Sequence, residues 1–410
     1  MRILNASAAE FLDAQEKFDS SNFLQSNQIY ELQQERNRFL LTERLLILND
    51  NEIVGLAIVN YRKKWKFFKE AIIVQGPVLD YSNITLVINA LNCLERHIAQ
   101  KNAISVMCHP YLIRVRKSVN QEIIKQSEND LVIDCFKKRN YYNSFDPNFL
   151  LDGLNQAFIK DLSDFKNYED VENRFSPSLK RNIKKFKDSH VFVSEFSREE
   201  IPLFYDILLK TSDRKAFAIP DIDLFYKLKD KFKSKAKFMY AYLDCNAYLN
   251  YLNTNISILK NQINDLYLKS DSKKRNMAIK NSEQQLKSFE KRLREFMSYD
   301  NTADRILLSS YLFIQFGDEL TSYFGGNIEK YFIFGGATLI NCDMLKFAKE
   351  NNLKYFNFGG TIETDQSSHG IGNFKYKKQF DGQLVQYLGS FTKPLSIIGK
   401  LLFYIKNIQP

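Results

Sequence analysis

The sequence predicts an α/β protein in which two tandem units, each with a mixed sheet, carry an antiparallel coiled-coil arm inserted in the second unit. Two observations predict this fold. Strand-like and helix-like runs follow one another in the same order in both halves of the 410-residue chain, as in α/β domains. Two heptad-patterned segments also interrupt a predicted β-hairpin in the second half, as a helical arm would.

In the first half, runs of β-branched and aromatic residues bounded by turn signals predict strands. Apolar residues at helical spacing from Leu86 to Ile98 predict an amphipathic helix. The third strand ends at Gly76-Pro77 and the fourth at Cys108-His109-Pro110. The expected order is a strand at 43–48, a turn at 49–51, strands at 53–61 and 71–74, the helix, and a strand at 103–107.

The second half repeats this order. The segment 156–232 is expected to be rich in helices and to open the second unit. The elements that follow are a strand at 238–243, the arm, strands at 306–316 and 320–324, a helix at 339–348, and a strand at 355–358 that ends at Gly359-Gly360. We therefore expect one unit at 1–150, a second at 151–245 and 300–410, and the arm at 246–299.

The arm is predicted from apolar residues that alternate at spacings of four and three on both sides of a polar, basic turn at 270–276. Residues 255–298 carry ten Lys or Arg and five Asp or Glu, an excess of five positive charges. Such a surface is typical of an arm that contacts an RNA backbone, but it also fits a solvated helix face. The apolar positions are Leu252, Ile256, Leu259, Ile263 and Leu266, and then Ile279, Leu286, Phe289, Leu293 and Phe296.

Composition excludes several classes of protein. The chain is 44% hydrophobic with eight prolines and no Ser/Gly linker, which is unlike a disordered protein. The sequence shows neither an apolar run long enough to span a membrane nor a signal-peptide core, so we expect a cytoplasmic protein. Five cysteines without CxxC spacing favour core positions over disulfides or zinc. The net charge of +10 favours an anionic partner.

A meander, a glycine-ended strand, a helix and a strand form the element order of an acyltransferase core of the GNAT type. Two such units with a coiled-coil arm resemble the Fem/MurM (FemABX) family, the tRNA-dependent aminoacyltransferases that build peptidoglycan bridges, and MurM-like members most of all. Motifs along nearly the whole chain carry the resemblance. They are Gln25-Ser26 after Asn22-Phe23-Leu24, the segment 75–83 (QGPVLDYSN), the basic helix at 178–185, Thr211-Ser212-Asp213-Arg214, and the segment 372–380 (GNFKYKKQF) followed by Tyr387-Leu388-Gly389.

The resemblance implies the reaction: an amine of a peptidoglycan stem peptide attacks the ester carbonyl of aminoacyl-tRNA, and a peptide bond forms. The implied partners are aminoacyl-tRNA, as co-substrate, and a lipid-linked or UDP-linked peptidoglycan precursor. No further cofactor and no metal are implied. The basic amphipathic segment at 393–406 suggests peripheral contact with the inner face of the plasma membrane, and packing against the protein body is the alternative.

The resemblance and the side-chain chemistry also nominate site residues. Lys375, beside Phe374 and after the loop 367–372, could stabilise an oxyanion or orient the terminal ribose of the tRNA. By resemblance Arg214 holds the diphosphate of the precursor, since a guanidinium forks onto phosphate oxygens. His109 stands where family members commonly carry Asp, and a neutral imidazole there could accept a proton.

Further departures from the family pattern mark substrate-binding candidates. Gln33 occupies a position where the family often has a phosphate-binding Lys, and Arg36 could compensate for the missing charge. Phe324 stands where a Tyr often precedes the glycine pair, and Tyr323 is expected on the opposite face of the strand. Gly359 and Gly360 could let backbone approach the substrate closely. Candidate tRNA contacts are Lys273, Lys274 and Arg275 in the arm and Lys180, Arg181 and Lys184 in the basic helix.

Two alternatives to the transferase remain at this stage. An acyl-CoA-dependent N-acetyltransferase would use the same core, but neither half carries the R/Q-x-x-G-x-G/A loop that binds the pyrophosphate of CoA. A diverged paralogue could bind tRNA or precursor without catalysis, and the changes at His109 and Gln33 are the reason to consider it.

Overall fold

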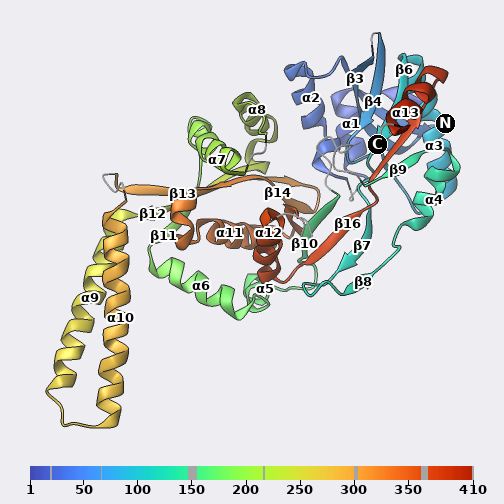
Figure 1. Cartoon of the computed structure of the whole chain (residues 1–410). Coiled ribbons are helices and arrows are strands. Elements are labelled where there is room, and N and C mark those ends of the chain that lie inside the picture. The colour runs from blue at the N-terminus through green and yellow to red at the C-terminus, as the bar shows by residue number, and fades with distance from the viewer. Residues whose placement is uncertain are drawn as a thin grey trace.

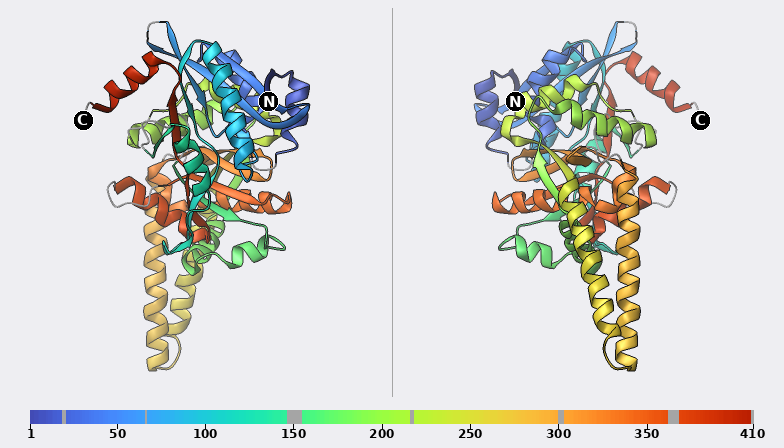
Figure 2. Two further views of the ribbon diagram at one scale, coloured as in Figure 1. Left: turned by 90° about the vertical axis from the view of Figure 1, so that its right-hand side faces the viewer. Right: turned by 90° about the vertical axis from the view of Figure 1, so that its left-hand side faces the viewer.

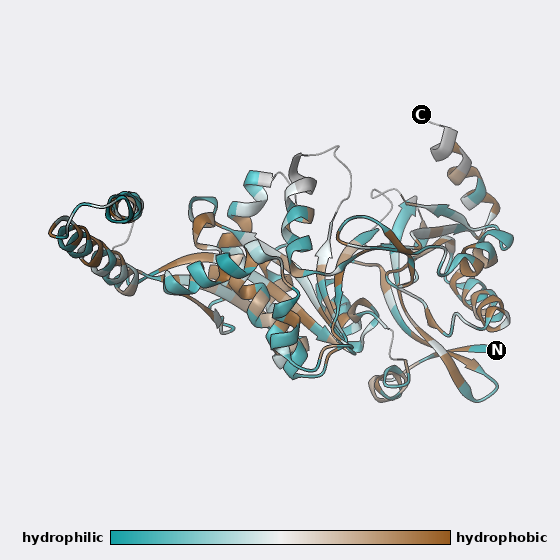
Figure 3. Ribbon diagram, turned by 90° about the horizontal axis from the view of Figure 1, so that it is seen from below, coloured by the Kyte–Doolittle hydropathy of each residue, from teal (hydrophilic) through white to brown (hydrophobic). Residues whose placement is uncertain are grey.

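The computed structural model describes residues 1–18, 21–65, 67–145, 155–215, 218–299, 303–361 and 368–408. Within these residues the chain forms two sheets with helices on their faces, and a long helical arm projects from the second sheet (Figure 1). Hydrophobic residues gather along the strands, whereas many outward-facing helix positions are hydrophilic (Figure 3). The mixed α/β architecture with two sheets is as predicted.

The first sheet has the order β1-β2-β3-β4-β6-β17-β9, with β5 beside β3, and β4 and β6 are its parallel pair. Helices α3 (Ile84–Gln100) and α4 (Asp130–Lys138) bury their apolar faces on one side, and α1 (Ala8–Gln15) and α2 (Asn27–Arg36) cover the other. The strands are β1 (Arg2–Asn5), β2 (Leu41–Asn49), β3 (Glu52–Trp65), β4 (Phe68–Ile73), β5 (Val78–Leu79), β6 (Ala103–Cys108), β9 (Tyr142–Ser144) and β17 (Ser390–Pro394).

The second sheet has the order β11-β12-β13-β14-β15-β10-β16-β7-β8, and its parallel pair is β14 and β15. The strands are β7 (Ile113–Lys117), β8 (Ile123–Lys125), β10 (Gln156–Asp161), β11 (Val191–Glu195), β12 (Ala236–Asp244), β13 (Arg305–Phe316), β14 (Glu319–Asn327), β15 (Tyr355–Gly360) and β16 (Gln383–Tyr387). Both sheets therefore place one parallel pair beside an antiparallel meander, which confirms the repeated order of elements.

Helices cover both faces of the second sheet. On one side lie α7 (Ile201–Lys215) and α8 (Ile222–Phe232), and on the other lie α6 (Pro177–Asp188), α11 (Gly336–Glu350) and α12 (Ser368–Lys377). Helices α6, α7 and α8, together with α5 (Tyr168–Asn173), confirm that 156–232 is rich in helices, although β10 and β11 also lie there. Short 3₁₀ segments occupy Phe23–Gln25, Lys233–Lys235, Glu329–Phe334 and Lys378–Phe380.

The two sheets exchange strands. β17, near the C-terminus, lies between β6 and β9 of the first sheet, while β7 and β8, from the first 150 residues, form an edge of the second. Accordingly strands from both ends of the chain, β1 and β17, belong to the first sheet. The domain boundaries stay a prediction, and the sheets themselves do not follow them, because strand pairing joins segments that are distant in sequence.

The arm consists of α9 (Cys245–Tyr267) and α10 (Lys273–Met297), which run antiparallel against each other (Figures 1 and 2). All ten predicted apolar positions are buried or half-buried, from Leu252 to Phe296. The tip turn is shorter than predicted, because Ser272 caps the start of α10 by accepting a hydrogen bond from the backbone of Arg275. The helix pair is therefore confirmed, while a superhelical coiled coil remains a prediction.

Candidate active site

A cleft of about 680 Å³ opens where the parallel strands β14 and β15 end. We call it the cleft throughout. Its walls come from β13, the ends of β14 and β15, the C-terminal parts of α6 and α7, the 3₁₀ segment before α11, the start of α11, and α12. The residues used below are Arg214, Tyr311, Tyr323, Phe324, Gly325, Asn327, Gly335, Gly336, Asn341, Gly359, Gly360, Tyr376 and Lys377.

Glycines at the end of the sheet let the neighbouring elements pack closely beside the cleft. A Cβ on Gly325 would lie 2.2 Å from the ring of Tyr311, and one on Gly326 would lie 2.8 Å from the backbone oxygen of Ile207 in α7. Gly359 has φ +76°, a left-handed conformation that favours glycine. The predicted glycine pairs therefore allow close packing of α7 and β15 on β14.

The Thr-x-x-Arg element fixes α7 to the end of β14. The Thr211 hydroxyl accepts a hydrogen bond from the backbone N–H of Asn327 at 2.8 Å and donates to the Ile207 carbonyl at 3.0 Å. One helical turn later, Arg214 lines the cleft. Its guanidinium lies 5.1 Å from the centre of the Phe332 ring and 3.8 Å from Glu329, so the cation is positioned but loosely held.

Tyr323 and Phe324 both line the cleft. We expected them on opposite faces of the strand, and this expectation is wrong. Leu312 pairs with Phe324 but the next residue of β13, Phe313, pairs with Ser322, so Tyr323 is the extra residue of a β-bulge. The bulge breaks the alternation of side chains, and the Tyr323 and Phe324 rings lie 4.5 Å apart.

Lys377, and not Lys375, is the lysine of the cleft. Lys377 is 7% exposed and its Nζ donates to the carbonyls of Gly359 and Gly360 at 3.0 and 2.6 Å. Lys375 is exposed on the outer side of α12 and does not line the cleft. Phe374 is buried in the core beside Phe158 and does not line it either. Residues three apart share a helix face, which is why Phe374 and Lys377 both point inward.

Polar groups that sequence reasoning missed complete the walls. Asn327 donates to the Tyr311 hydroxyl at 3.0 Å, and Asn341 donates to the Tyr376 hydroxyl at 3.0 Å. Burial raises the pKa of both tyrosines, so their hydroxyls stay protonated and can donate to a ligand. The described residues that line the cleft include no carboxylate and no histidine.

The start of α11 forms another part of the wall. Gly335, with φ +64°, precedes the helix, and Gly336 and Ala337 of its first turn face the cleft. Backbone N–H groups at a helix N-terminus and the helix dipole favour an anion. This wall and Arg214 together give the cleft two features that suit a phosphate group.

Other predicted residues lie elsewhere. Gln33 is half-buried on α2, and Arg36 forms an ion pair with Asp221 at 3.0 Å between α2 and α8. His109 is buried just after β6, where its backbone N–H donates to the Ile73 carbonyl at 3.0 Å. None of the three lines the cleft. The roles proposed for them from sequence remain predictions without a place in this geometry.

The predicted tRNA contacts occupy two surfaces. Lys180, Arg181 and Lys184 are exposed on α6, whose Phe186 reaches the cleft. Lys273 and Lys274 are exposed at the tip of the arm. Arg275 instead stabilises the tip turn, because its guanidinium donates to the Lys269 carbonyl at 2.6 Å and pairs with Asp271 at 2.9 Å.

The remaining chemistry is limited. All five cysteines are buried, as predicted, and are unpaired with one another. In the described part of the chain no group of three or more His, Cys, Asp or Glu side chains could hold a metal ion. No helix among the same residues is both long and apolar enough to cross a membrane.

Comparison with known proteins identifies the family. The FemAB family model matches residues 6–408. The chain belongs to the FemAB family. It is 27% identical to aminoacyltransferase FemA of Staphylococcus epidermidis, over 97% of this chain and 96% of that protein. It is 26% identical to aminoacyltransferase FemA of Staphylococcus aureus (strain bovine RF122 / ET3-1), with the same coverage.

The solved structure of FemX superposes with a TM-score of 0.74 at 19% identity, covering 99% of both chains. This likeness confirms the fold over 99% of this chain. The resemblance stated from sequence motifs is thus confirmed by family and by fold, and the protein is an aminoacyltransferase.

Proposed function

We propose that this FemAB protein transfers an amino acid from aminoacyl-tRNA to the stem-peptide amine of a lipid-linked peptidoglycan precursor, and so builds the interpeptide bridge. One observation carries the proposal. A cation, Lys377, and two anion-binding features, Arg214 and the start of α11, converge on a single cleft in an aminoacyltransferase. The reaction needs both, since its substrates carry phosphates and its transition state carries an oxyanion.

Lys377 is positioned for the oxyanion. Its ammonium is fixed by hydrogen bonds to two carbonyls of the β15 end, which holds a positive charge at the wall of the cleft. When the acceptor nitrogen attacks the ester carbonyl, the N–C bond forms, the C–O bond to the ribose breaks, and a proton of the amine passes to the departing ribose oxygen. With no carboxylate or histidine among the described cleft residues, the substrate itself is the proton acceptor in this proposal.

Arg214 and the α11 N-terminus would bind the diphosphate of the precursor. Arg214 is only loosely held at 3.8 Å by Glu329, so a phosphate can replace that contact. The exposed lysines of α6 extend from the rim of the cleft and would contact the tRNA backbone, with Lys273 and Lys274 of the arm as a second contact. Aminoacyl-tRNA serves as co-substrate and the proposal includes no further cofactor.

Together with this function we propose two details of the fold. Each unit is a GNAT-type core, supported by the parallel pairs β4–β6 and β14–β15 beside antiparallel meanders. The arm is a coiled coil, supported by the buried heptad positions of α9 and α10. Neither half of the sequence carries the loop that binds the pyrophosphate of CoA. A tRNA-dependent aminoacyltransferase is therefore a better explanation than an acyl-CoA-dependent N-acetyltransferase.

We further propose that the protein works in the cytoplasm, at the inner face of the plasma membrane. Helix α13 (Ile397–Ile408) contacts β6 and β17 and packs Phe403 on Tyr142 of β9, and from there it projects outward (Figure 2). Ile397, Leu401 and Ile405 lie four residues apart and are 86, 61 and 51% exposed, and Lys400 beside them is exposed too. An apolar stripe with a basic neighbour suits an anionic lipid surface, where a lipid-linked acceptor resides.

Transfer is tested by incubating the purified protein with lipid-linked precursor and tRNA charged with a panel of small amino acids. Mass spectrometry should show a gain of one amino-acid residue that RNase abolishes. Binding of tRNA without any gain in mass would contradict the transferase and favour the binding-only paralogue.

The membrane contact is tested by sedimentation with anionic vesicles. Leu401→Glu should abolish co-sedimentation, because it buries a charge in the lipid boundary. Ile258→Glu is the matched control, since Ile258 is also exposed but lies on the arm. Equal sedimentation of the two variants would contradict the contact through α13.

A further inference from the structure

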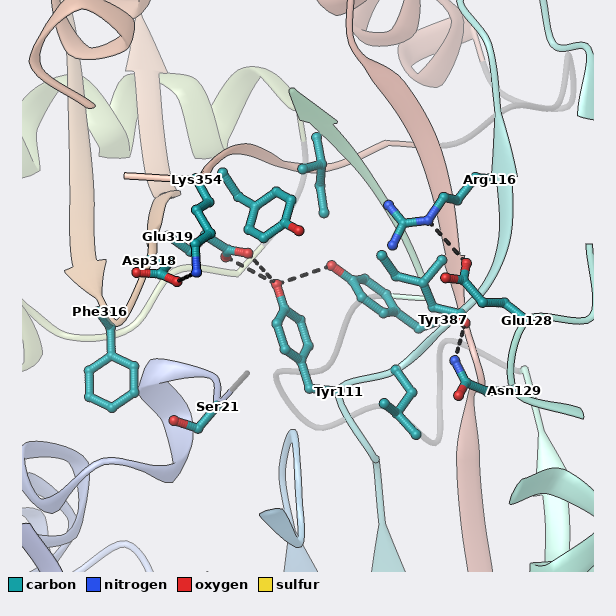
Figure 4. A pocket seen from close by; sticks show the side chains of 14 residues that line it. Ser21, Tyr111, Arg116, Glu128, Asn129, Phe316, Asp318, Glu319, Lys354 and Tyr387 are labelled. Carbon is teal, nitrogen blue, oxygen red and sulfur yellow. Dashed lines mark hydrogen bonds and ion pairs between the residues drawn. The ribbon is translucent and has the colours of Figure 1, made fainter. Parts of the chain in front are cut away.

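A second cavity, of about 360 Å³, lies at the opposite end of the parallel strand pair from the cleft (Figure 4). We call it the Glu319 cavity. Glu319 and Tyr355 line it at the start of β14 and β15, whereas the cleft lies where these strands end. The rise of a strand places the two sites roughly 20 Å apart. They share no lining residue, so the cavity needs a separate explanation.

Glu319 is held in place by neutral donors. The Tyr111 hydroxyl donates to Glu319 Oε2 at 2.8 Å, and Thr321 and Asn357 donate to Oε1 at 2.5 and 3.2 Å. A carboxylate has about four acceptor positions, and three donors fill three of them. The carboxylate is therefore oriented by its neighbours and keeps acceptor capacity on the side of Oε2.

The charges around the cavity do not balance. Its lining contains three acidic side chains and two basic ones. Arg116 pairs with Glu128 at 3.0 Å, and Lys354 pairs with Asp318 at 2.6 Å. Within the lining these pairs leave the carboxylate of Glu319 as the negative charge in excess, and Lys125, outside the lining, also pairs with Glu128 at 3.0 Å. Burial raises the pKa of Glu319, and a cation beside it would reverse that cost by favouring the ionised form.

Aromatic faces form the wall beside this carboxylate. The rings of Tyr111 and Tyr387 stack with centres 5.1 Å apart, and their hydroxyls lie 3.3 Å from each other (Figure 4). Burial and the nearby carboxylate raise the pKa of Tyr111 well above its ordinary value, so the hydroxyl stays a donor. Tyrosine faces attract ammonium groups, most strongly where water is excluded.

We propose that the Glu319 cavity binds a protonated primary amine, with Glu319 as counter-ion and the Tyr111–Tyr387 stack as the aromatic wall. The ligand class is a small molecule or an amino-acid side chain that ends in an ammonium group on an apolar stem. Carboxylate, hydroxyls and π faces together match that ligand, while an anion would meet the excess negative charge. The inference goes beyond the proposed transfer reaction and does not depend on it.

The test uses two probes that differ in one charge. Nα-acetyl-L-lysine methylamide carries the ammonium, and Nα-acetyl-L-norleucine methylamide is a neutral analogue with a similar stem. Calorimetric titration of the full chain, without tRNA or precursor, should show at least tenfold tighter binding of the lysine probe. Binding measured in this way is independent of transfer, so failure of one proposal is distinguishable from failure of the other.

Variants then locate the binding. Glu319→Gln keeps the shape of the side chain and should remove the preference for the lysine probe. Glu122→Gln removes the same charge from an exposed position of the sequence and should retain the preference. Tyr387→Leu changes the aromatic wall from another strand and should weaken lysine-probe binding several-fold.

Three outcomes would overturn the proposal. They are equal affinity for the two probes, no binding of the lysine probe at millimolar concentration, and an undiminished preference in Glu319→Gln. The first two need no variant, so the proposal stays testable even where Glu319→Gln does not fold.

Discussion

In the first sheet a glutamine side chain fills the space just after β4, beside β3, whereas in the second sheet β14 and β15 end at the open cleft. Gln25 is 1% exposed, donates to the Val74 carbonyl just after β4, and accepts from the backbone N–H of Ile58 at 2.8 Å. A Cβ on Gly76 would lie 2.7 Å from Gln25 Cδ, so the glutamine fills the space completely.

The difference shows how one arrangement of strands serves two purposes. β14 and β15 pair only at 319–321 with 355–357, whereas β4 and β6 stay paired up to Ile73 and Cys108. Buried backbone groups need partners, and in the first unit Gln25 satisfies those of Val74 and Ile58. In the second unit the open space is where we propose that substrate binds. The family motif at Gln25-Ser26 is thereby explained as structural, since Ser26 also caps α2 by accepting from the backbone of Ile29 at 3.2 Å.

The largest expected effect is at the open end. Lys377→Met should lower the rate of transfer about 100- to 1,000-fold, the range for losing one donor to an oxyanion. Lys375→Met is the matched control two residues away and should stay close to the unchanged protein, since Lys375 is exposed. Single-turnover rates and melting temperatures of both variants separate catalysis from folding. A slow Lys375→Met with a normal Lys377→Met would restore the assignment made from sequence.

The closed end should respond in stability instead. Gln25→Ala leaves two backbone groups without their partner and opens a cavity, which should cost about 3 kcal/mol in urea unfolding. Where the variant is folded, its transfer rate should match that of the unchanged protein. A variant of normal stability but reduced turnover would show that the first unit also holds substrate.

Acid sensitivity should also belong to the first unit. Burial acts to raise the pKa of Glu43, but hydrogen bonds from His97 and Tyr61 hold it down to about 2. A depressed carboxyl pKa gives stability that is complete above the ordinary value near 4.5 and is lost as the pH falls toward 2. Glu43→Gln should therefore lower the unfolding free energy by about 2 kcal/mol at pH 7, and by progressively less below pH 4.5. A constant difference across this range would contradict the ionised state of Glu43.

The smallest effect is expected farthest from both strand ends, at the tip of the arm. Replacing Lys273 and Lys274 with Gln should weaken tRNA binding a few-fold and reduce its salt dependence by about two charges, if each lysine contacts one phosphate. The measurement is tRNA affinity between roughly 50 and 200 mM salt, the range over which phosphate contacts change affinity strongly. Lys291→Gln with Lys280→Gln, exposed lysines along α10, is the matched pair. An unchanged salt dependence in the tip variant would indicate that α6, and not the tip of the arm, contacts the tRNA backbone.

Local patterns were predictable and distant pairings were not. The heptads located both helices of the arm, and runs of β-branched residues located β2, β3, β12 and β13, because these signals lie within one element. The pairing of β17 with β6 joins residues nearly 300 positions apart, and no local pattern reports it. The short strands β7, β8 and β16 were missed for the same reason.

The site divides in the same way. Arg214, Gly359 and Gly360, which motif and glycine spacing mark in the sequence, lie in the cleft, as do Phe324 and Tyr323, while their roles stay predictions. The bulge at Tyr323 depends on its partner strand and could not be read from alternation. Lys377 could have been preferred over Lys375, had the segment after the loop been read as a helix with Phe374 facing the core.

The exchange of β17 between the sheets also sets the order in which the chain can be completed during synthesis. A ribosome that has released the first 350 residues has made both edges of the gap in the first sheet, β6 and β9, but not the strand that joins them. Until residues 390–394 emerge, those two strand edges expose unpaired backbone groups that invite pairing with other chains. We therefore expect the nascent chain to be prone to such pairing until β17 has been made.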